Sequence, residues 1–396
     1  MPPAAAIRHP LLIACFLSLG PALSLGLARF AYALLLPSMR GDLHLSFASA
    51  GALNTANAAG YLIGAIASVG WAHRLGARKV FLWGCMLTVA SLALCGITRS
   101  YALLLALRLA AGVSSAMVFS IGGVLASKLA SQHAERAGLV LGLYYSGTGL
   151  GIVLSACLMP WLLEGGGSHW QWAWFALAVL GSLATLLVWR PSGQITIAAS
   201  TQGAHHRWPF KPFIPALLGY FCFGLGYIGY MTFNVALLKQ QGASGGQITL
   251  FFSLLGLAVC LSSRLWASLL DRYRNGRPLA TLNLLVGIAS VLPTLNPSFA
   301  LALLSGVLFG ACFLSVVAST TALVRHNLPQ DHWPAGIALF TSTFALGQII
   351  GPTAVGWLSD GAGLEKGLLG SGLALLLGAV LAWWQPALAL PRKESV

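Results

Sequence analysis

Long apolar runs alternate with short polar or glycine- and proline-rich breaks along the whole chain. A helix that crosses a bilayer needs about 20 consecutive, mostly apolar residues, and the runs reach this length. The first run is longer than the roughly 7–15 apolar residues of a secretion signal, so we expect it to be a spanning helix as well. The pattern predicts twelve membrane-spanning helices, at residues 11–37, 47–72, 79–97, 101–128, 137–162, 170–189, 212–238, 247–270, 278–296, 299–325, 333–358 and 364–385.

Composition supports a membrane protein over a soluble one. The chain has 396 residues, of which 57% are hydrophobic and only 8% are charged, whereas about 25% of residues are charged in an average soluble domain. A soluble enzyme of this length needs a far more charged surface. We therefore expect an all-α integral membrane protein.

The longest polar stretch, residues 190–211, divides the predicted helices into two sets of six. Its length and its Pro, Ser, Gly and His content are typical of a linker between domains. We expect an N-terminal six-helix half at residues 1–189, a cytoplasmic linker at 190–211 and a C-terminal six-helix half at 212–396.

The distribution of positive charge predicts the topology. The chain carries 22 Lys and Arg against eight Asp and Glu, an excess that would suggest nucleic-acid binding in a soluble protein. With both termini inside, three of the 22 lie within helices and fifteen lie on the cytoplasmic side. Only four lie in outer loops: Arg40, Arg99, Lys239 and Lys366. From this positive-inside bias we expect a multi-pass protein of a bacterial cytoplasmic membrane, with both termini in the cytoplasm. The bias explains the positive charge, so we expect no nucleic-acid partner.

The two halves also resemble each other. Gly147-Thr-Gly-Leu-Gly151 in the fifth predicted helix aligns with Thr343-Phe-Ala-Leu-Gly347 in the eleventh, and the basic loop 73–78 aligns with the loop 271–277. A six-plus-six parallel repeat, with a substrate site between its halves, is a common plan of secondary transporters.

This plan, with a basic loop between helices 2 and 3, resembles the major facilitator superfamily. In its loop motif Arg74, Gly76, Arg78 and Lys79 match, whereas His73 replaces the usual Asp. Arg108-Leu-Ala-Ala-Gly112 is similar to the motif of helix 4. Three further strings resemble the YbfB/YjiJ branch: Gly26-Leu-Ala-Arg29-Phe-Ala-Tyr32, Asn54-Thr-Ala-Asn57 and Leu346-Gly-Gln348-Ile-Ile-Gly351-Pro352. The resemblance implies the major facilitator fold and a transport role, but no substrate. The helix-5 signature of proton-coupled exporters is absent, so export does not follow from it.

The two copies of the basic loop predict a cytoplasmic gate. His73, Arg74 and Arg78 belong to the first copy, and Asp271 and Arg272 to the second. A carboxylate at a cytoplasmic helix end can pair with a neighbouring Arg and hold one conformation closed. Because only the second copy keeps the Asp, we expect an asymmetric latch.

Arg29 and Arg108 are the sharpest candidates for a binding site. Both fall at a similar depth inside predicted helices 1 and 4, where a charge costs about 2.5–3.5 kcal/mol on insertion scales and faces protein or water. A guanidinium there can bind a carboxylate or phosphate through two parallel hydrogen bonds. The alternative is a structural Arg satisfied by carbonyls and hydroxyls. The third intramembrane Arg, Arg264, lies near a helix end, where snorkelling or pairing is expected.

Polar and aromatic side chains accompany these arginines on the helices expected to line the substrate site. Some will face the substrate, and others will form hydrogen bonds between helices, worth about 0.6 kcal/mol each. Glycines of helices 5 and 11 indicate close helix packing. The candidate substrate-binding or coupling residues beside the two arginines are Tyr32, Asn54, Asn57, Tyr61, Tyr145, Tyr227, Tyr230, Asn234 and Gln348.

Residues for catalysis or metal binding do not gather at one place. None of the eight acids and none of the nine His falls at the middle of a predicted span, and the seven Cys lie in apolar runs without metal-ligand spacing. Such Cys behave as small apolar packing residues. We expect no catalytic residue, no metal and no cofactor, and no enzymatic activity.

The sequence thus predicts a secondary active transporter that moves a small organic solute, with an anion favoured, by alternating access. We expect a monomer in the lipid bilayer, and a co-transported ion is compatible with the sequence. Two alternatives stay open: export of an amphipathic compound on the same fold, and an integral-membrane transferase or hydrolase. The latter requires carboxylates or His that face one pocket at the membrane interface.

The charge bias makes the topology testable. Reporters fused after Arg99 or Glu164 should behave as external, and those after Lys79, Gly203 or Lys393 as internal, because cytoplasmic loops retain the Lys and Arg. Paired phosphatase and fluorescent-protein fusions measure this. A periplasmic C-terminus would contradict the count of twelve helices.

Overall fold

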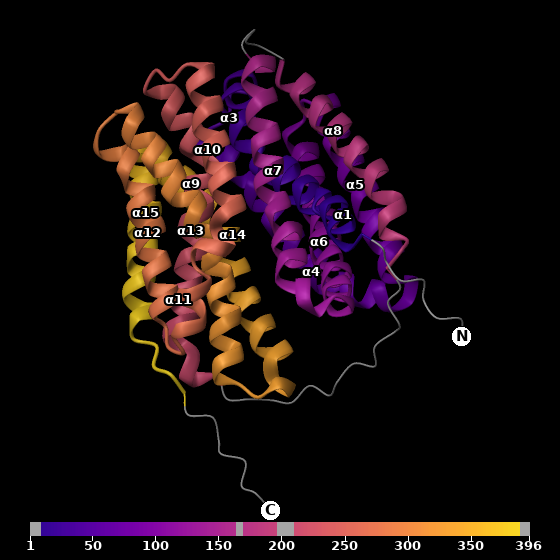
Figure 1. The fold of residues 1–396 in the computed structure, drawn as a ribbon. Coiled ribbons are helices and arrows are strands. Elements are labelled where there is room, and N and C mark those ends of the chain that lie inside the picture. The colour runs from indigo at the N-terminus through magenta and orange to yellow at the C-terminus, as the bar shows by residue number, and fades with distance from the viewer. Residues whose placement is uncertain (1–8, 164–168, 196–209, 389–396) are drawn as a thin grey trace, which may run out of the picture. The chain divides into compact units, whose positions relative to one another are not determined.

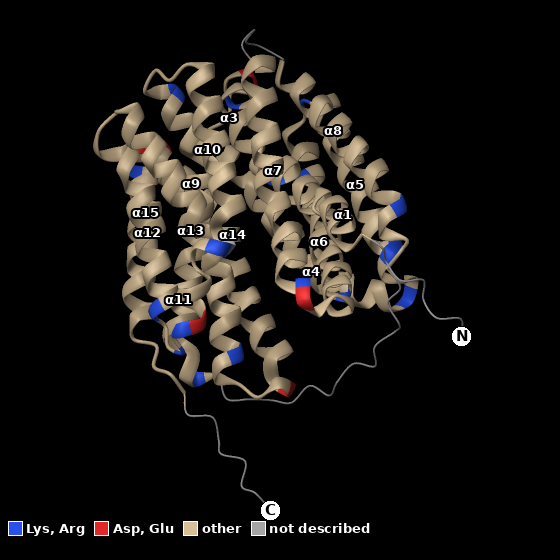
Figure 2. Cartoon of the chain, in the orientation of Figure 1, with Lys and Arg blue, Asp and Glu red and all other residues tan. Residues whose placement is uncertain are grey.

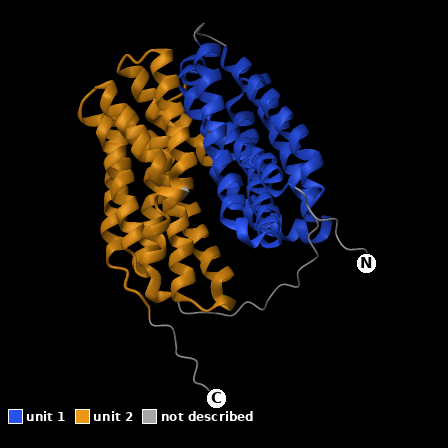
Figure 3. Ribbon diagram, viewed as in Figure 1, with its two compact units in different colours: residues 1–44, 56–200 blue, residues 45–55, 201–396 orange. Residues whose placement is uncertain are grey.

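The computed structural model describes residues 9–163, 169–195 and 210–388. Every regular element among them is helical (Figure 1). The chain forms two compact units: unit 1 comprises residues 1–44 and 56–200, and unit 2 comprises residues 45–55 and 201–396 (Figure 3). The boundary between the units therefore falls inside a helix as well as in the predicted linker.

Unit 1 is built around the first six predicted spans. Helix α5 lies between α6 and α8, and the π-helix η1 packs on α7. Its elements are α1 (Pro10–Leu17), α2 (Leu19–Pro21), η1 (Ala22–Phe30), α3 (Tyr32–Asp42), most of α4 (Phe47–Leu75), α5 (Ala77–Ile97), α6 (Tyr101–Gln132), the turn η2 (Ala134–Arg136), α7 (Ala137–Leu163) and α8 (His169–Ser192).

Unit 2 repeats this arrangement. Helix α12 lies between α13 and α15, α14 packs on α9, and α10 packs on α13. Its elements are the start of α4, the turn η3 (Lys211–Phe213), α9 (Ile214–Gln240), α10 (Gly245–Leu265), α11 (Ala267–Arg272), α12 (Arg277–Leu295), α13 (Phe299–Asn327), the turn η4 (Gln330–His332), α14 (Trp333–Ala362) and α15 (Leu364–Trp383).

The predicted spans agree with these helices. Among the described residues, eleven helices are long and apolar enough to cross a membrane. The second predicted span, helix α4, is not among these eleven. It is long enough, with 29 residues, but polar residues such as Asn54 and Asn57 lower its mean hydropathy. The first span continues beyond its expected end to Asp42, and Pro37 lies inside it. Spanning helices tolerate a proline when neighbouring groups form hydrogen bonds with the backbone groups that it leaves unpaired. Helix α8 extends to Ser192, and residues 196–209 of the predicted linker lie outside the described residues.

The first span is wound unevenly. Its central nine residues, Ala22–Phe30, form a π-helix whose residues are all buried, and Arg29 lies in its last turn. The backbone N–H of Ala31 donates to the carbonyl of Gly26 at 3.0 Å, an i→i+5 bond. Helices with this bonding are rare and occur mostly as single turns, often at functional sites. The unusual winding therefore marks the segment that carries Arg29.

Glycines let two helix pairs approach closely, as the sequence predicted. In unit 1, a Cβ added at Gly26 would collide with the backbone of Gly151, and one added at Gly151 would collide with the carbonyl of Ala22. In unit 2, a Cβ at Gly347 or Gly351 would collide with the backbone of α9. The repeat thus preserves one packing contact: α7 against η1 and α14 against α9.

The first nine residues of α4 are held by α14 inside unit 2. Both oxygens of Asp360 accept backbone N–H groups, from Phe47 at 2.7 Å and Ala48 at 2.9 Å. Farther along α4, the hydroxyl of Thr55 donates to the carbonyl of Ile349 at 2.7 Å. A carboxylate at a helix N-terminus satisfies unpaired N–H groups and the positive end of the helix dipole. The sequence analysis did not find this role of Asp360.

The close contact of η1 with α7 predicts different effects of the same substitution along α7. Ala favours a helix over Gly by roughly 0.5–1 kcal/mol, and nothing lies within 4 Å of a Cβ at Gly142. Gly142→Ala should therefore keep or raise the melting temperature in nanodiscs. Gly151→Ala should lower it, because overpacking costs about 1–3 kcal/mol. Equal melting temperatures would contradict the close contact.

The cap on α4 is testable by hydrogen exchange. Asp360→Ala should speed exchange of the amides of Phe47 and Ala48 and lower stability by about 1 kcal/mol, as lost N-terminal caps do. Asp331→Ala is the matched control, because Asp331 is exposed in the short turn η4. Unchanged exchange at residues 47 and 48 in Asp360→Ala would show that the carboxylate does not cap α4.

Candidate functional site

Arg108 lies at the centre of a network that joins four elements of unit 1. Its side chain on α6 is 1% exposed, and its Nη1 donates to the carbonyl of Ala28 in η1 at 2.6 Å. The guanidinium lies over the rings of Tyr32 and Trp174, at 5.0 and 5.4 Å from their centroids. Aromatic faces and a carbonyl stabilise a cation away from water. Of the two interpretations for Arg108, this geometry favours a structural one.

Asn57 extends this network to α4. Its Nδ2 donates to the backbone carbonyl of Arg108 at 3.2 Å, and its side chain is completely buried. Its Oδ1 receives no hydrogen bond from the described residues. A buried amide oxygen without a donor is costly and is satisfied by water or a ligand in functional sites.

Arg29 is held beside this network but is placed differently. It directly follows Ala28, the residue bound by Arg108, so the two arginines are close neighbours in unit 1. Its side chain is 3% exposed, and its Cζ lies 5.5 Å from the ring centroid of Tyr61 on α4. Arg108 therefore holds the backbone next to Arg29, and the Arg29 side chain lies within the π-helical segment, against Tyr61.

Acidic residues are scarce around these two cations. The helices of unit 1 that surround them contain one acid, Asp42, at the end of α3. Asp42 accepts hydrogen bonds from Arg99 at 2.7 Å and from Trp170 Nε1 at 2.8 Å. Figure 2 shows most charged residues of the described chain near helix ends. The charge near Arg29 and Arg108 is thus strongly positive, which favours an anionic ligand.

The remaining candidates divide between the two units. Tyr145 on α7 belongs to unit 1, with its ring 5.8 Å from that of Phe119. In unit 2, Tyr227 donates to Gln348 at 2.7 Å, and Asn54 at the start of α4 donates to Thr232 at 2.7 Å. Tyr230 shares a 2.6 Å hydrogen bond with Ser305. These bonds between helices are the alternative role that the sequence analysis left open.

Asn234 is buried in unit 2, on α9, one helical turn after Tyr230. Its Oδ1 accepts the backbone N–H of Val235 at 2.6 Å, while its Nδ2 donates to none of the described residues. A buried donor of this kind is available to a ligand or water. Asn234 thus keeps both interpretations.

Nearly parallel aromatic rings fill the space between α9, α13 and α14. The ring of Phe344 lies 4.9 Å from Tyr220 and 5.5 Å from both Phe223 and Tyr227. The stack continues from Tyr227 to Phe313 at 6.0 Å. The rings of α9 and α13 in this stack are buried. The candidates named from the sequence include Tyr227 of this stack but none of its phenylalanines, because an apolar ring on a spanning helix carries no polar signal.

The predicted cytoplasmic gate is described separately in each unit. In unit 1, His73 and Arg74 are exposed at the end of α4, and Arg78 Nη2 donates to the carbonyl of Trp189 at 3.0 Å. In unit 2, Asp271 and Arg272 are exposed on α11, and Arg272 lies 5.6 Å from the ring centroid of Tyr273. Asp271 forms no ion pair within 4 Å in the described part of the chain. The asymmetric latch stays a prediction.

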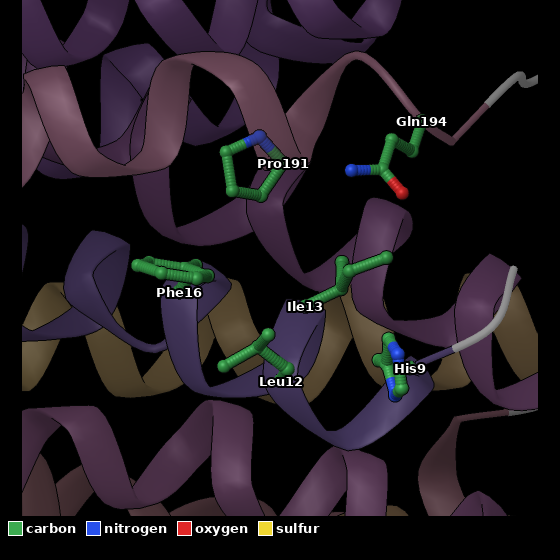
Figure 4. A pocket seen from close by; sticks show the side chains of 6 residues that line it. All are labelled: His9, Leu12, Ile13, Phe16, Pro191 and Gln194. Atoms are coloured by element: carbon green, nitrogen blue, oxygen red, sulfur yellow. The ribbon is translucent and has the colours of Figure 1, made fainter.

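A small pocket lies elsewhere in unit 1, between the start of α1 and the end of α8 (Figure 4). Its volume is about 140 Å³, and His9 is the one ionisable residue among those that line it. Its lining residues are His9, Leu12, Ile13, Phe16, Pro191 and Gln194. Since Arg29 and Arg108 are absent from it, we do not place the substrate there. The described residues contain no cluster of three or more His, Cys, Asp or Glu that could bind a metal.

Eleven described helices that are long and apolar enough to span a membrane, buried arginines on the first and fourth spans, and glycine contacts repeated in both units agree with the major facilitator fold. The chain belongs to the family described as "Uncharacterised MFS-type transporter YbfB", which it matches over residues 21–383. This confirms the family that the sequence motifs suggested.

Curated relatives match parts of the chain. It is 36% identical over 94 residues to the "Uncharacterized MFS-type transporter YceJ" of Bacillus subtilis, a match that covers 24% of each protein. It is 26% identical over 173 residues to a "Multi-drug resistance efflux pump PmrA homolog" of Lactococcus lactis, covering 42% of the chain and 40% of that protein. The matches thus span less than half of either relative.

Solved structures share the fold over nearly the whole chain. A bacterial homologue of the human lysosomal transporter Spinster, in an inward-facing and unoccupied conformation, aligns with a TM-score of 0.75 at 14% identity, covering 96% of this chain and 98% of that one. The nucleoside transporter NupG aligns with a TM-score of 0.73 at 13% identity, covering 94% and 98%. At these identities the likeness shows the fold alone.

Proposed function

We propose that the protein is a secondary active transporter that moves a small organic anion by alternating access, with Arg29 as the residue that binds the anion. The observation that carries this proposal is the burial of Arg29 in the π-helical turn of unit 1, over the ring of Tyr61, beside helices whose sequence contains one acid, Asp42 at the end of α3. Arginine keeps its proton at any relevant pH, so a bound carboxylate or phosphate is its natural partner at membrane depth.

Arg108 acts in this proposal as a positioning residue. Its hydrogen bond to Ala28 and its two aromatic neighbours fix the turn that presents Arg29. Two residues support Arg108: the ring of Tyr32 lies against its guanidinium, and the side chain of Asn57 donates a hydrogen bond to its backbone carbonyl. Tyr227, Asn234 and Gln348 of unit 2 stay further candidate binding residues.

The proposed setting is a bacterial cytoplasmic membrane with both termini in the cytoplasm, as the positive-inside bias supports. We propose a monomer that works with or without a co-transported ion. Neither the direction of transport nor the ion follows from Arg29, because an anion site serves uptake and export equally.

Export of an amphipathic compound is the second candidate function. The partial similarity to an efflux pump homologue and the aromatic stack of unit 2 favour it. Aromatic walls bind apolar bodies without any dependence on an Arg. The two functions therefore differ in whether binding needs Arg29.

Binding by variants in nanodiscs separates the two functions. Arg29→Gln should abolish saturable binding of organic anions, and Arg29→Lys should restore it only in part, because the bidentate fork is lost. Arg108→Gln should weaken binding at least tenfold, the equivalent of ~1.4 kcal/mol, and also lower the melting temperature. Flux into inverted and right-side-out vesicles then gives the direction.

Arg264→Gln serves as the control, because Arg264 is exposed near the end of α10. It should keep wild-type affinity. A well-folded Arg29→Gln protein with unchanged affinity, or a cationic cognate substrate, would contradict the anion proposal and support export of amphipaths.

A further inference from the structure

A partly exposed aromatic surface continues from Tyr61, the residue that lies against Arg29. The ring of Tyr61 is 6.4 Å from that of Phe119 on α6, and Phe119 is 5.8 Å from Tyr145 on α7. These separations are within the 4.5–7 Å range of interacting aromatic rings. Tyr61, Phe119 and Tyr145 thus form one surface, here named the unit 1 aromatic surface, that begins at the Arg29 guanidinium.

The exposure of this surface distinguishes it from ordinary packing. Tyr145 is 40% exposed, and Tyr61 and Phe119 are half-buried, whereas the rings of α9 in the unit 2 stack are covered by one another. Tyrosine is favoured at membrane interfaces, near helix ends. Tyr61 and Tyr145 instead lie well inside α4 and α7, where a polar group faces protein or a water-filled cavity. The unit 1 aromatic surface is therefore suited to contact a ligand.

A buried residue, Tyr144, holds the unit 1 aromatic surface in place. Tyr144 is completely buried, its hydroxyl donates to the carbonyl of Phe119 at 2.8 Å, and its ring meets Tyr145 edge-on at 5.1 Å. These contacts fix α7 against α6. Rigid aromatic rings lose little conformational entropy when a ligand packs on them.

We propose that the transported anion is an aromatic acid, whose carboxylate binds Arg29 while its ring packs on Phe119 and Tyr145. This inference rests on the proposed function of Arg29. Tyr61 lies against both the guanidinium and Phe119, so the acid would lie along the Tyr61 ring with its carboxylate at Arg29.

Asn57 adds a further requirement on this substrate. It lies one helical turn before Tyr61 on α4, and its buried Oδ1 has no donor among the described residues. A hydroxyl or amino group on the acid can supply that donor, which removes the penalty of a buried acceptor. Because Asn57 binds α6 at Arg108, well before Phe119, we expect aromatic acids with a hydroxyl beside the carboxylate to bind more tightly than the parent acids.

The test measures the affinity of four small probes for the full-length protein in nanodiscs: phenylacetate, cyclohexylacetate, mandelate (phenylacetate with a hydroxyl next to the carboxylate) and phenylethanol. Phenylacetate should bind about fivefold more tightly than cyclohexylacetate, equivalent to ~1 kcal/mol. The hydroxylated acid should bind more tightly still, and phenylethanol should not bind detectably.

Variants assign the preference to the surface. Phe119→Leu and Tyr145→Leu should reduce the preference for phenylacetate over cyclohexylacetate to less than twofold, and Tyr145→Phe should retain it. Phe175→Leu is the matched control, because Phe175 is half-buried on α8 of the same unit and packs on Trp172 instead. It should behave as wild type.

The outcomes separate this inference from the proposed function. If carboxylates bind in an Arg29-dependent manner but phenylacetate and cyclohexylacetate bind equally, the aromatic inference is wrong and the anion proposal stands. If no carboxylate binds, or if Arg29→Gln binds them normally, the anion proposal itself fails. If phenylethanol binds as well as phenylacetate, the surface serves neutral amphipaths and both proposals fail.

Discussion

The burial of the Arg108 guanidinium is the constraint on which the organisation of unit 1 depends. A charge at membrane depth must be surrounded by groups that replace water. Here one carbonyl of η1 and the rings of Tyr32 and Trp174 do so, and the carbonyl of Arg108 in turn accepts Asn57. Because these groups come from η1, α3, α4 and α8, a single residue of α6 contacts four neighbouring elements through its side chain and its backbone.

The same constraint places Arg29. The turn that contains Ala28 is π-helical, and its other side approaches α7 so closely that only Gly fits at 26 and 151. Packing from α7 and a hydrogen bond from Arg108 thus act on adjacent turns of the first span. In the proposed function, Arg108 is thus the positioning residue, and Arg29 is the binding residue beside the unit 1 aromatic surface. When one residue supports the fold and another binds the ligand, the binding residue can change partners without unfolding its surroundings.

Much of the fold could be predicted because its signals are local and strong. Long apolar runs gave the spans, and the glycines of α7 and α14 indicated the close contacts that the structure contains. The π-winding of Ala22–Phe30 could not be predicted, since it is set by tertiary packing and not by residue propensity. The grouping of residues 45–55 with unit 2 depends on Asp360, which is distant in sequence.

The candidate site was predicted in part for a similar reason. Charged and polar residues in apolar helices are conspicuous, so Arg29, Arg108, Asn57 and Tyr61 could be selected from the sequence. Trp174 and Phe119 could not, because an aromatic ring on a spanning helix can equally face lipid. The structure adds them through their contacts with Arg108 and Tyr61.

Direct contact between the substrate and Arg29 is the central claim of this account. Solid-state NMR can measure it as a distance between an isotope-labelled ligand carboxylate and isotope-labelled guanidinium nitrogens in nanodiscs. The account predicts a carbon–nitrogen distance of about 4 Å, as in a bidentate pair, that disappears in Arg29→Lys and persists in Arg264→Lys. A ligand carboxylate that binds with no guanidinium nearby, or whose contact survives in Arg29→Lys, would contradict it.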